Sequence, residues 1–127
     1  TAVALTTEEE GVALSCGAWL GGDKSVLLMQ SSGVGNCINM FSILKSCEFP
    51  FLTIVTMRGE FEEFNSWQKP MGIATKEILQ AMDFEIFRVE QSEDVTPLIK
   101  DAFKKVFLNN SKVAILLSQR FIGKKKW

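Results

Sequence analysis

Continuous apolar runs that alternate with helical patterns are the feature of this sequence that most constrains its fold. Residues 25–29, 51–57 and 113–117 have the length and composition of strands buried on both faces. Residues 84–89 alternate between apolar and polar side chains, which is typical of a half-exposed strand near a sheet edge. Buried strands that alternate with helices form parallel sheets covered on both faces. The sequence therefore predicts an α/β fold of three layers, αβα, around a mostly parallel sheet.

The length and charge of the chain exclude several classes of function. A chain of 127 residues suits one domain, and we expect residues 1–127 to form it. The formal charge is −1, with 14 basic and 15 acidic residues, so we expect neither a nucleic-acid footprint nor a membrane-surface patch. No apolar run reaches the roughly 18 to 20 residues that span a bilayer. These features predict a cytoplasmic protein.

The residue types that the chain lacks limit its chemistry. There is no histidine, which excludes Ser-His or Cys-His nucleophiles and His-containing metal sites within the chain. Proton transfer must therefore use a carboxylate, a lysine, a cysteine or a cofactor. Cys16, Cys37 and Cys47 lack C-x-x-C spacing and stand among apolar neighbours, so we expect small core residues there.

The N-terminal region combines a short apolar segment with an acidic helix start. Residues 1–5 predict a strand that leads into a helix from Thr7 onward. Thr7 and Glu10 have the spacing of a capping box, and acids in a first turn are stabilised by the free N–H groups there. On this interpretation Glu8, Glu9 and Glu10 need no further function. The helix also holds small residues that indicate close approach of another backbone: Gly11, Ala13, Ser15, Cys16, Gly17 and Ala18.

A glycine-bearing turn over residues 30–36 separates the first buried strand from an apolar helix expected over residues 37–44. N–H groups at such a helix start favour anions, and ligands of open parallel sheets collect beyond the carboxyl ends of strands. The turn is a weak dinucleotide fingerprint, because Ile38 stands where a third glycine or alanine belongs after Gly33 and Gly35. A tight strand-to-helix turn without a ligand is the alternative.

Residues 61–72 form the longest stretch without helical or strand periodicity. Loops of this length in compact domains are usually functional or disordered, and the aromatic residues Phe61, Phe64 and Trp67 argue against disorder. We therefore expect an interface or a lid here, followed by a short helix that begins at Thr75.

Four motifs lie at successive predicted strand ends or helix starts. They are Glu-Glu-Glu-Gly at residues 8–11, Met-Gln-Ser-Ser-Gly-Val-Gly-Asn at residues 29–36, Arg-Gly-Glu at residues 58–60 and, as a weaker signal, Ser-Gln-Arg at residues 118–120. In this order they resemble the pyrimidine-binding (alpha) subunits of thiamine-diphosphate-dependent decarboxylases, specifically the sulfopyruvate and phosphonopyruvate decarboxylase group. The resemblance covers essentially the whole chain.

The resemblance implies roles for individual residues. In that family an essential glutamate lies two positions before a small residue of the helix, which selects Glu9. Its carboxyl group hydrogen-bonds a ring nitrogen of the aminopyrimidine and activates thiamine diphosphate, so the cofactor provides the base that histidine would otherwise supply. Ser31 stands where relatives often carry asparagine. The resemblance implies further cofactor contacts at Ser32, Gly33, Val34, Gly35 and Asn36.

The resemblance also implies a partner. The family binds diphosphate and magnesium through Gly-Asp-Gly followed by Asn-Asn, and no Gly-Asp-Gly precedes Asn109 and Asn110 in this chain. We therefore expect no metal ligand here, and a beta-type subunit that binds magnesium and the diphosphate in a hetero-oligomer. The implied fold is the flavodoxin-like pyrimidine-binding domain, without the first βα unit with which that domain normally begins.

The substrate implied by the resemblance is 3-sulfopyruvate, which would be converted to sulfoacetaldehyde and carbon dioxide. Arg58 is the candidate contact for the anionic group, with Ser32 and Gln68 as further candidates. By position alone, Arg58 is equally a solvated arginine at a strand end. Three other hypotheses stay open: a phosphonopyruvate decarboxylase subunit, a flavodoxin-like module that binds phosphate or flavin at residues 32–35 with Glu9 only as a cap, and an inactive regulatory subunit.

Overall fold

The computed structural model describes residues 1–124, which form one four-stranded sheet and the helices around it. The sheet has the strand order β1-β2-β4-β3, and each neighbouring pair is parallel. The strands are β1 (Leu27–Gln30), β2 (Phe51–Thr56), β3 (Glu85–Val89) and β4 (Lys112–Leu117). The predicted α/β fold with a parallel sheet is confirmed.

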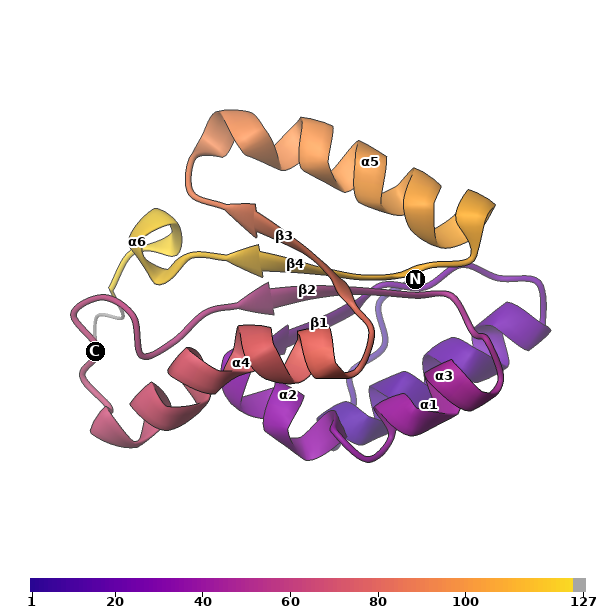
Figure 1. Cartoon of the computed structure of the whole chain (residues 1–127), viewed down its shortest axis with the longest axis horizontal. Helices are drawn as coiled ribbons and strands as arrows, with labels where there is room; N and C mark the ends of the chain where they lie inside the picture. Colours follow the sequence, from indigo (N-terminus) through magenta and orange to yellow (C-terminus); the bar gives the residue numbers. More distant parts are fainter. Residues whose placement is uncertain (125–127) are drawn as a thin grey trace.

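Helices cover both faces of the sheet (Figure 1). One face carries α5 (Ser92–Asn109). The other face carries α1 (Glu8–Leu20), α2 (Ser31–Cys37), α3 (Phe41–Ser46) and α4 (Lys69–Ala81). Two short helices complete the described part of the chain, η1 (Ser66–Gln68) and α6 (Gln119–Ile122). This arrangement confirms the three layers expected from the sequence.

The core consists of two apolar layers, one on each face of the sheet. The larger layer packs α1 to α4 on the sheet. Within it, Val12 of α1 and Val55 of β2 belong to the same apolar cluster. The smaller layer lies beneath α5, where Val106 joins Leu52. Successive residues of a strand point to opposite faces, so the central strands β2 and β4 contribute to both layers. Their continuous apolar runs in the sequence follow from this position.

The edge strand β1 departs from the predicted burial. Leu27 and Met29 belong to the larger apolar layer, whereas Leu28 points to the other face and is 70% exposed. The prediction that residues 25–29 form a strand buried on both faces is therefore wrong, because α5 packs on β2, β3 and β4. β3 lies at the opposite edge, as its alternating sequence predicted.

The start of α1 differs from the prediction in two respects. Residues 1–5 are extended but pair with no strand among the described residues, so the predicted strand is not formed. Thr7 is the N-cap residue, yet its side chain makes no capping hydrogen bond. Glu10 reaches one residue further back instead, and its Oε2 accepts a hydrogen bond from Thr6 N at 2.8 Å.

Two helix boundaries also differ from the prediction. The glycine-bearing stretch is helical, because α2 begins at Ser31 directly after β1. A break over residues 38–40 then separates α2 from α3, so the single predicted helix is divided. α4 begins at Lys69 and not at Thr75, with Pro70 in its first turn, where the missing N–H has no helical acceptor.

The three cysteines differ in burial. Cys16 and Cys37 are buried as predicted, but Cys47 is exposed, so the prediction of a core position is wrong for that residue. Cys47 directly follows α3, whose buried residues are Phe41 and Leu44.

No helix within residues 1–124 is both long and apolar enough to cross a membrane.

Candidate functional site

The acidic first turn of α1 packs against α2 beyond the carboxyl end of β1. Glu8 Oε2 accepts a hydrogen bond from Asn36 Nδ2 at 2.9 Å. The Glu8 side chain also covers Gly33 closely, since a Cβ atom on Gly33 would lie 2.6 Å from Glu8 Cγ. The glycine at position 33 is thus explained by the approach of Glu8, and this contact fixes α1 relative to α2.

The three acids of this turn have different surroundings. Glu8 is bonded to Asn36, and Glu10 accepts the backbone N–H of Thr6. Glu9 Oε2 is buried and has no hydrogen-bond partner within residues 1–124. Buried carboxylate oxygens nearly always have a donor, so an unpartnered one indicates a place where a ligand or another chain donates. Glu9 is therefore the acid with unused binding capacity.

The pKa of Cys37, at the end of α2, is affected by the carboxylates at the contact between α1 and α2. Burial, and after it the negative charges of Glu8 and Glu9, raises the pKa of the Cys37 thiol to about 12. Both carboxyl groups therefore lie near α2. The thiol stays protonated near neutral pH, which excludes it as a nucleophile.

The central residues of the predicted cofactor-binding stretch face protein atoms. Val34 is fully buried in the larger apolar layer, and Gly33 lies beneath the Glu8 side chain. Gly35 faces α4, since a Cβ atom there would lie 3.3 Å from Met71 Sδ. Any ligand contact from these three residues would therefore use backbone atoms.

The polar residues of the same stretch make different hydrogen bonds. Ser31 is fully buried, and its Oγ accepts a hydrogen bond from Arg58 N at 3.1 Å, which ties the start of α2 to the end of β2. Ser32 Oγ lies 3.4 Å from Gln30 Oε1, to which it donates. Ser32 and Asn36 are partly or fully exposed, so their side chains remain accessible.

Arg58 lies just beyond β2, and its guanidinium group is buried against Glu63. Arg58 Nε donates to Glu63 Oε2 at 2.8 Å and Nη2 to Oε1 at 2.5 Å, with the two side chains 8% and 1% exposed. Glu63 also accepts hydrogen bonds from Gly59 N, Asn65 N and Gln119 Nε2. Arg58 above all, together with these donors, lowers the pKa of Glu63 to about 2. Arg58 is thus a paired, buried cation and not a solvated arginine.

Gln119 joins this loop to the end of β4. Its Oε1 accepts hydrogen bonds from Glu60 N at 2.8 Å and Phe61 N at 3.0 Å, and its backbone N–H donates to Glu60 Oε2 at 3.1 Å. Glu60 in turn forms a bidentate ion pair with Arg88 of β3, with N–O distances of 2.7 and 2.9 Å. The Arg-Gly-Glu and Ser-Gln-Arg motifs therefore form one network across the carboxyl ends of β2, β4 and β3.

Gln68 closes η1 against the same loop. A Cβ atom on Gly59 would lie 2.7 Å from Gln68 O, and Gln68 Oε1 is buried. Gln68 Oε1 and Glu9 Oε2 are the two buried side-chain acceptors without a partner in the part of the chain that the structure describes. They lie at or just before the starts of α4 and α1, and both of these helices pack against α2.

The aromatic segment predicted as an interface or lid places large apolar side chains on the surface. Phe64 and Trp67 are 73% and 71% exposed, and Ile73 on α4 is 76% exposed. The backbone of the segment is anchored from inside by Glu63, as described above. Its role as an interface stays a prediction.

Known proteins match the chain over most of its length. The alpha subunit of sulfopyruvate decarboxylase from Methanococcus maripaludis is 41% identical over 116 residues, which are 91% of this chain and 70% of the relative. The alpha subunit of the same name from Methanothermobacter thermautotrophicus is 38% identical over 117 residues, again 91% of this chain and 70% of the relative. This chain belongs to the sulfopyruvate decarboxylase alpha-subunit family.

Family membership confirms the resemblance on which the motifs were interpreted, and with it the enzyme class, a decarboxylase subunit. The relatives' designation as alpha subunits indicates an enzyme of more than one subunit. A phosphonopyruvate decarboxylase from Streptomyces viridochromogenes is also similar, with 35% identity over 92 residues, which are 71% of this chain and 23% of the relative. No protein-family model matches the chain.

In this member of the alpha-subunit family, the predicted site residues form two groups linked through α2. Glu9, Ser32 and Asn36 belong to the α1–α2 contact, whereas Arg58 lies just beyond β2 and Gln68 ends η1, which packs on Gly59. The hydrogen bond from Arg58 N to Ser31 Oγ connects the two groups.

Sequence reasoning missed Glu63 and underestimated Gln119. Glu63 had no signal of its own within the aromatic segment. The only sequence signal for Gln119 was its place directly after a buried strand, in the weakest of the four motifs. The structure makes these two residues the hydrogen-bonding centre of the network around Arg58.

Proposed function

We propose that this chain is the alpha-type subunit of a thiamine-diphosphate-dependent decarboxylase that converts 3-sulfopyruvate to sulfoacetaldehyde and carbon dioxide. In this reaction the bond between the keto carbon and the carboxylate carbon breaks, carbon dioxide leaves, and a proton takes its place on the former keto carbon. The names of the relatives support this substrate. The observation within the chain that carries the proposal is the buried, unpartnered Glu9 Oε2.

The surroundings of Glu9 fit the aminopyrimidine ring of thiamine diphosphate. A ring nitrogen of that group can share a proton with a carboxyl oxygen, and Glu9 Oε2 is a buried oxygen to which no group in the described part of the chain donates. When bound, thiamine diphosphate supplies the nucleophilic carbon and the electron sink that decarboxylation needs. Glu9 holds the shared proton at Oε2, while the contacts of Glu8 and Glu10 fix the first turn of α1.

The polar residues around this carboxyl group complete the proposed site. Ser32 and Asn36 offer side-chain contacts to the cofactor, and Gly33, Val34 and Gly35 offer backbone contacts along α2. Gln68 and Ser32 contact the anionic substrate. Arg58 contacts the same anionic substrate. A guanidinium group has five N–H donors, so Arg58 has donors left that Glu63 does not use.

The same proposal assigns the diphosphate and magnesium to a beta-type subunit. The alpha-subunit designation of the relatives and the absence of Gly-Asp-Gly from this chain support the assignment. The cofactor then lies between the two chains, and the aromatic segment around Trp67 faces the partner.

The decisive experiment compares Glu9→Gln with Glu10→Gln in the complex with the beta-type subunit. We expect Glu9→Gln to reduce the rate of carbon dioxide release by roughly 100-fold or more, because proton transfer at a positioned group contributes about that much. Binding of thiamine diphosphate, measured by calorimetry, should persist. Glu10→Gln should stay within a few-fold of the parent, because Glu10 only caps α1. Near-parental activity of Glu9→Gln would refute the mechanism.

A phosphonopyruvate decarboxylase subunit is the second candidate. The similarity to the Streptomyces viridochromogenes enzyme supports it, although that match covers less of this chain than the matches to the sulfopyruvate enzymes do. The ratio of kcat/KM for 3-sulfopyruvate to that for phosphonopyruvate, measured on the same complex, distinguishes the two. A ratio below one would identify phosphonopyruvate as the preferred substrate and would refute the assignment of 3-sulfopyruvate.

A further inference from the structure

Gln119 stands where the backbone is held on both sides. It follows β4, a central strand that pairs with both β2 and β3. The preceding residue, Ser118, donates its N–H to Val89 O at 3.0 Å, and its Oγ accepts the N–H of Phe121 as the cap of α6. Gln119 itself is 2% exposed, so its side chain extends into the protein from a fixed backbone.

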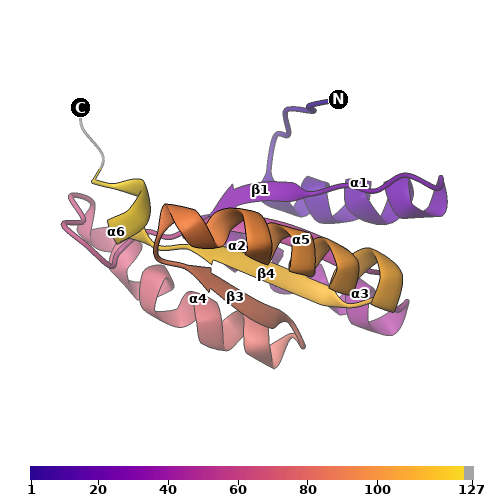
Figure 2. The ribbon, with the colours of Figure 1, turned by 90° about the horizontal axis from the view of Figure 1, so that it is seen from above.

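Gln119 and its neighbour Arg120 hold the segment that joins β2 to η1. In both Figure 1 and Figure 2, α6 lies beside this segment. Gln119 Oε1 accepts the N–H groups of Glu60 and Phe61, and the guanidinium carbon of Arg120 lies 4.3 Å from the centre of the Phe61 ring. The next residue, Glu62, has a φ of 44°, a left-handed conformation that residues other than glycine keep only where contacts hold them.

The two ends of the Gln119 amide have different partners. Oε1 faces the two N–H donors of the segment, whereas Nε2 donates to Glu63 Oε2 at 2.9 Å. These partners also assign which end of the group is oxygen and which is nitrogen. An ionised carboxylate at this position would lack the donor, and an apolar side chain would lack both functions. Position 119 therefore requires a group that accepts on one side and donates on the other.

Glu63 fixes the orientation of Arg58. Its carboxylate accepts hydrogen bonds from Arg58 Nε and Nη2, and the Arg58 side chain is 8% exposed. Only a small part of the guanidinium group can therefore meet a ligand. Which N–H donors are presented depends on where the Glu63 carboxylate lies, and Gln119 Nε2 is the one side-chain amide that donates to that carboxylate among the described residues.

We propose that Gln119 is a positioning residue for the substrate. Its amide holds Glu63, and through Glu63 it holds the guanidinium group of Arg58 in the orientation that presents the remaining N–H donors to the sulfonate of 3-sulfopyruvate. This inference rests on the proposed function.

The contacts of the Gln119 backbone separate this role from the rest of the network. Gln119 N donates to Glu60 Oε2 at 3.1 Å, and Glu60 pairs with Arg88 of β3. These bonds do not use the Gln119 side chain. A substitution of that side chain therefore acts on Glu63 and on the two N–H groups of the segment, while the ion pair between Glu60 and Arg88 keeps its partners.

Gln119→Glu makes the donor to Glu63 titratable. When protonated, the introduced carboxyl group accepts with one oxygen and donates with the other, as the amide does. When ionised, it faces the Glu63 carboxylate, with Glu60 bonded to the same residue's N–H. Arg58 and Arg88 are already paired with Glu63 and Glu60. Because two carboxyl groups that share a site cannot both ionise easily, we expect the donor to be present at about pH 5 and absent at about pH 8.

The KM for 3-sulfopyruvate, measured in the complex with the beta-type subunit, tests the proposal at these two pH values. Relative to the parent at the same pH, Gln119→Glu should raise KM at least about 10-fold at about pH 8 and less than about 2-fold at about pH 5. The kcat should stay within a few-fold, because Glu9 is unchanged. An unchanged KM at both pH values, or an equal rise at both, would overturn the proposal.

Gln119→Met removes the donor and the acceptor without adding a titratable group. It should raise KM at least about 10-fold at both pH values alike. A parental KM for this variant would also contradict the proposal.

The Arg58 Nε–H provides a readout that is independent of catalysis. Its hydrogen exchange is followed by NMR in the full chain, and Arg58→Lys identifies the signal by its loss. In Gln119→Glu we expect exchange at least about 10-fold faster than in the parent at about pH 8, and within about 2-fold of the parent at about pH 5. Exchange equal to that of the parent at both pH values would refute the positioning role.

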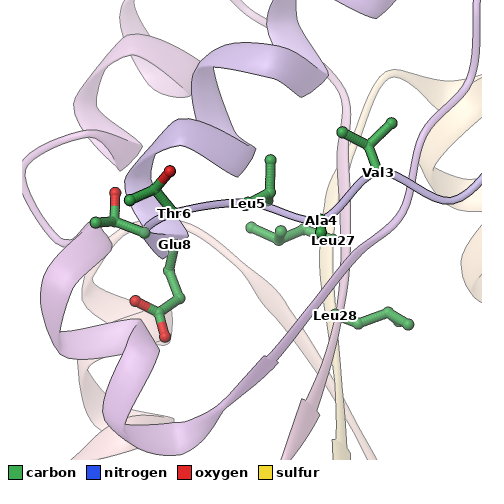
Figure 3. Close-up of a pocket in the computed structure, with 8 residues that line it drawn as sticks. Val3, Ala4, Leu5, Thr6, Glu8, Leu27 and Leu28 are labelled. Atoms are coloured by element: carbon green, nitrogen blue, oxygen red, sulfur yellow. The ribbon is translucent and has the colours of Figure 1, made fainter.

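Two control variants separate this effect from added charge and from lost stability. Gln80→Glu adds the same charge on the exposed side of α4. Leu27→Ala removes a buried side chain at the β1 edge, beside a hollow of about 310 Å³ (Figure 3), and should lower the Tm. In both controls the ratio of KM at about pH 8 to KM at about pH 5 should equal that of the parent. A changed ratio in either control would show that the hydrogen bond of Gln119 does not determine KM.

The two readouts distinguish a failure of this inference from a failure of the proposed function. If the parent complex releases no carbon dioxide from 3-sulfopyruvate, the proposed function is wrong, and the exchange of the Arg58 Nε–H still decides whether Gln119 positions the guanidinium group. If that exchange responds to Gln119→Glu while KM does not, Gln119 holds Arg58 without a role in substrate binding, and the inference is wrong.

Discussion

Glu63 holds the guanidinium group of Arg58 in a bidentate ion pair whose carboxylate is 1% exposed. Three further N–H donors, from Gly59, Asn65 and Gln119, complete the shell of that carboxylate. A buried ion pair is stable only when its remaining hydrogen-bonding capacity is satisfied, and here two backbone N–H groups of the loop and the side-chain amide of Gln119 satisfy it. The loop after β2 is therefore organised around Glu63.

Removal of this carboxylate should be costly. We expect Glu63→Gln to lower the free energy of unfolding by about 3 kcal/mol or more, because Arg58 would be left as a buried cation without its counter-charge. Urea unfolding followed by circular dichroism measures the change.

Glu62 provides the control for this substitution. It adjoins Glu63, is 51% exposed, and pairs with the exposed Lys124. Glu62→Gln should change the free energy of unfolding by no more than about 0.5 kcal/mol. Equal losses for the two variants would show that the charge at Glu63 is not what stabilises the loop.

The same carboxylate predicts a dependence of stability on pH. The folded-state pKa of Glu63 is about 2, below the ordinary value of 4.5, so the unfolded chain takes up the proton first as the pH falls. Its contribution is complete above about pH 5 and is lost between about pH 4.5 and pH 2. Urea titrations at several pH values should show this loss in the parent and a shallower slope in Glu63→Gln. Identical slopes would contradict the assignment.

Two glycines in long helices should respond in opposite directions to alanine. Gly72 in α4 packs on the backbone of Arg58, and a Cβ atom there would clash with Arg58 O, so we expect Gly72→Ala to destabilise the chain by about 2 kcal/mol or more. A Cβ atom on Gly17 in α1 would meet no described residue within 4 Å, so Gly17→Ala should stabilise the chain by about 0.5–1 kcal/mol. The Tm values of the two variants report the signs, and a shift in the same direction for both would be the contrary result.

The cysteines should differ in reactivity towards a thiol reagent. Cys47 is exposed, whereas Cys16 and Cys37 are buried and their thiol pKa values are raised chiefly by that burial. In the folded chain at pH 8 we expect one thiol to react within minutes and two only after unfolding in guanidinium chloride. Cys47→Ser should remove the fast reaction, and its persistence in that variant would disprove the assignment.

Local sequence patterns were sufficient for the fold class. The apolar runs of β2 and β4 indicate strands buried on both faces, and the helices between strands indicate a parallel sheet, because both inferences depend only on period and composition. The order of short motifs was sufficient for the family. Helix boundaries were harder to predict from the sequence. The glycines of α2 suggested a turn, but they lie within a helix, where the close approach of Glu8 and Met71 leaves no room for larger side chains.

The tertiary structure decided which polar groups meet and which apolar residues remain uncovered. Glu9 was selected from the sequence by its offset to Gly11, but only the fold shows that its neighbours have partners while its own Oε2 has none among residues 1–124. Gln119 reaches Glu60 across 59 positions, and Leu28 is exposed because no described element packs on its face of β1. Periodicity assigns a side chain to a face of its own element, whereas its partner is chosen by elements that the chain brings back from far away.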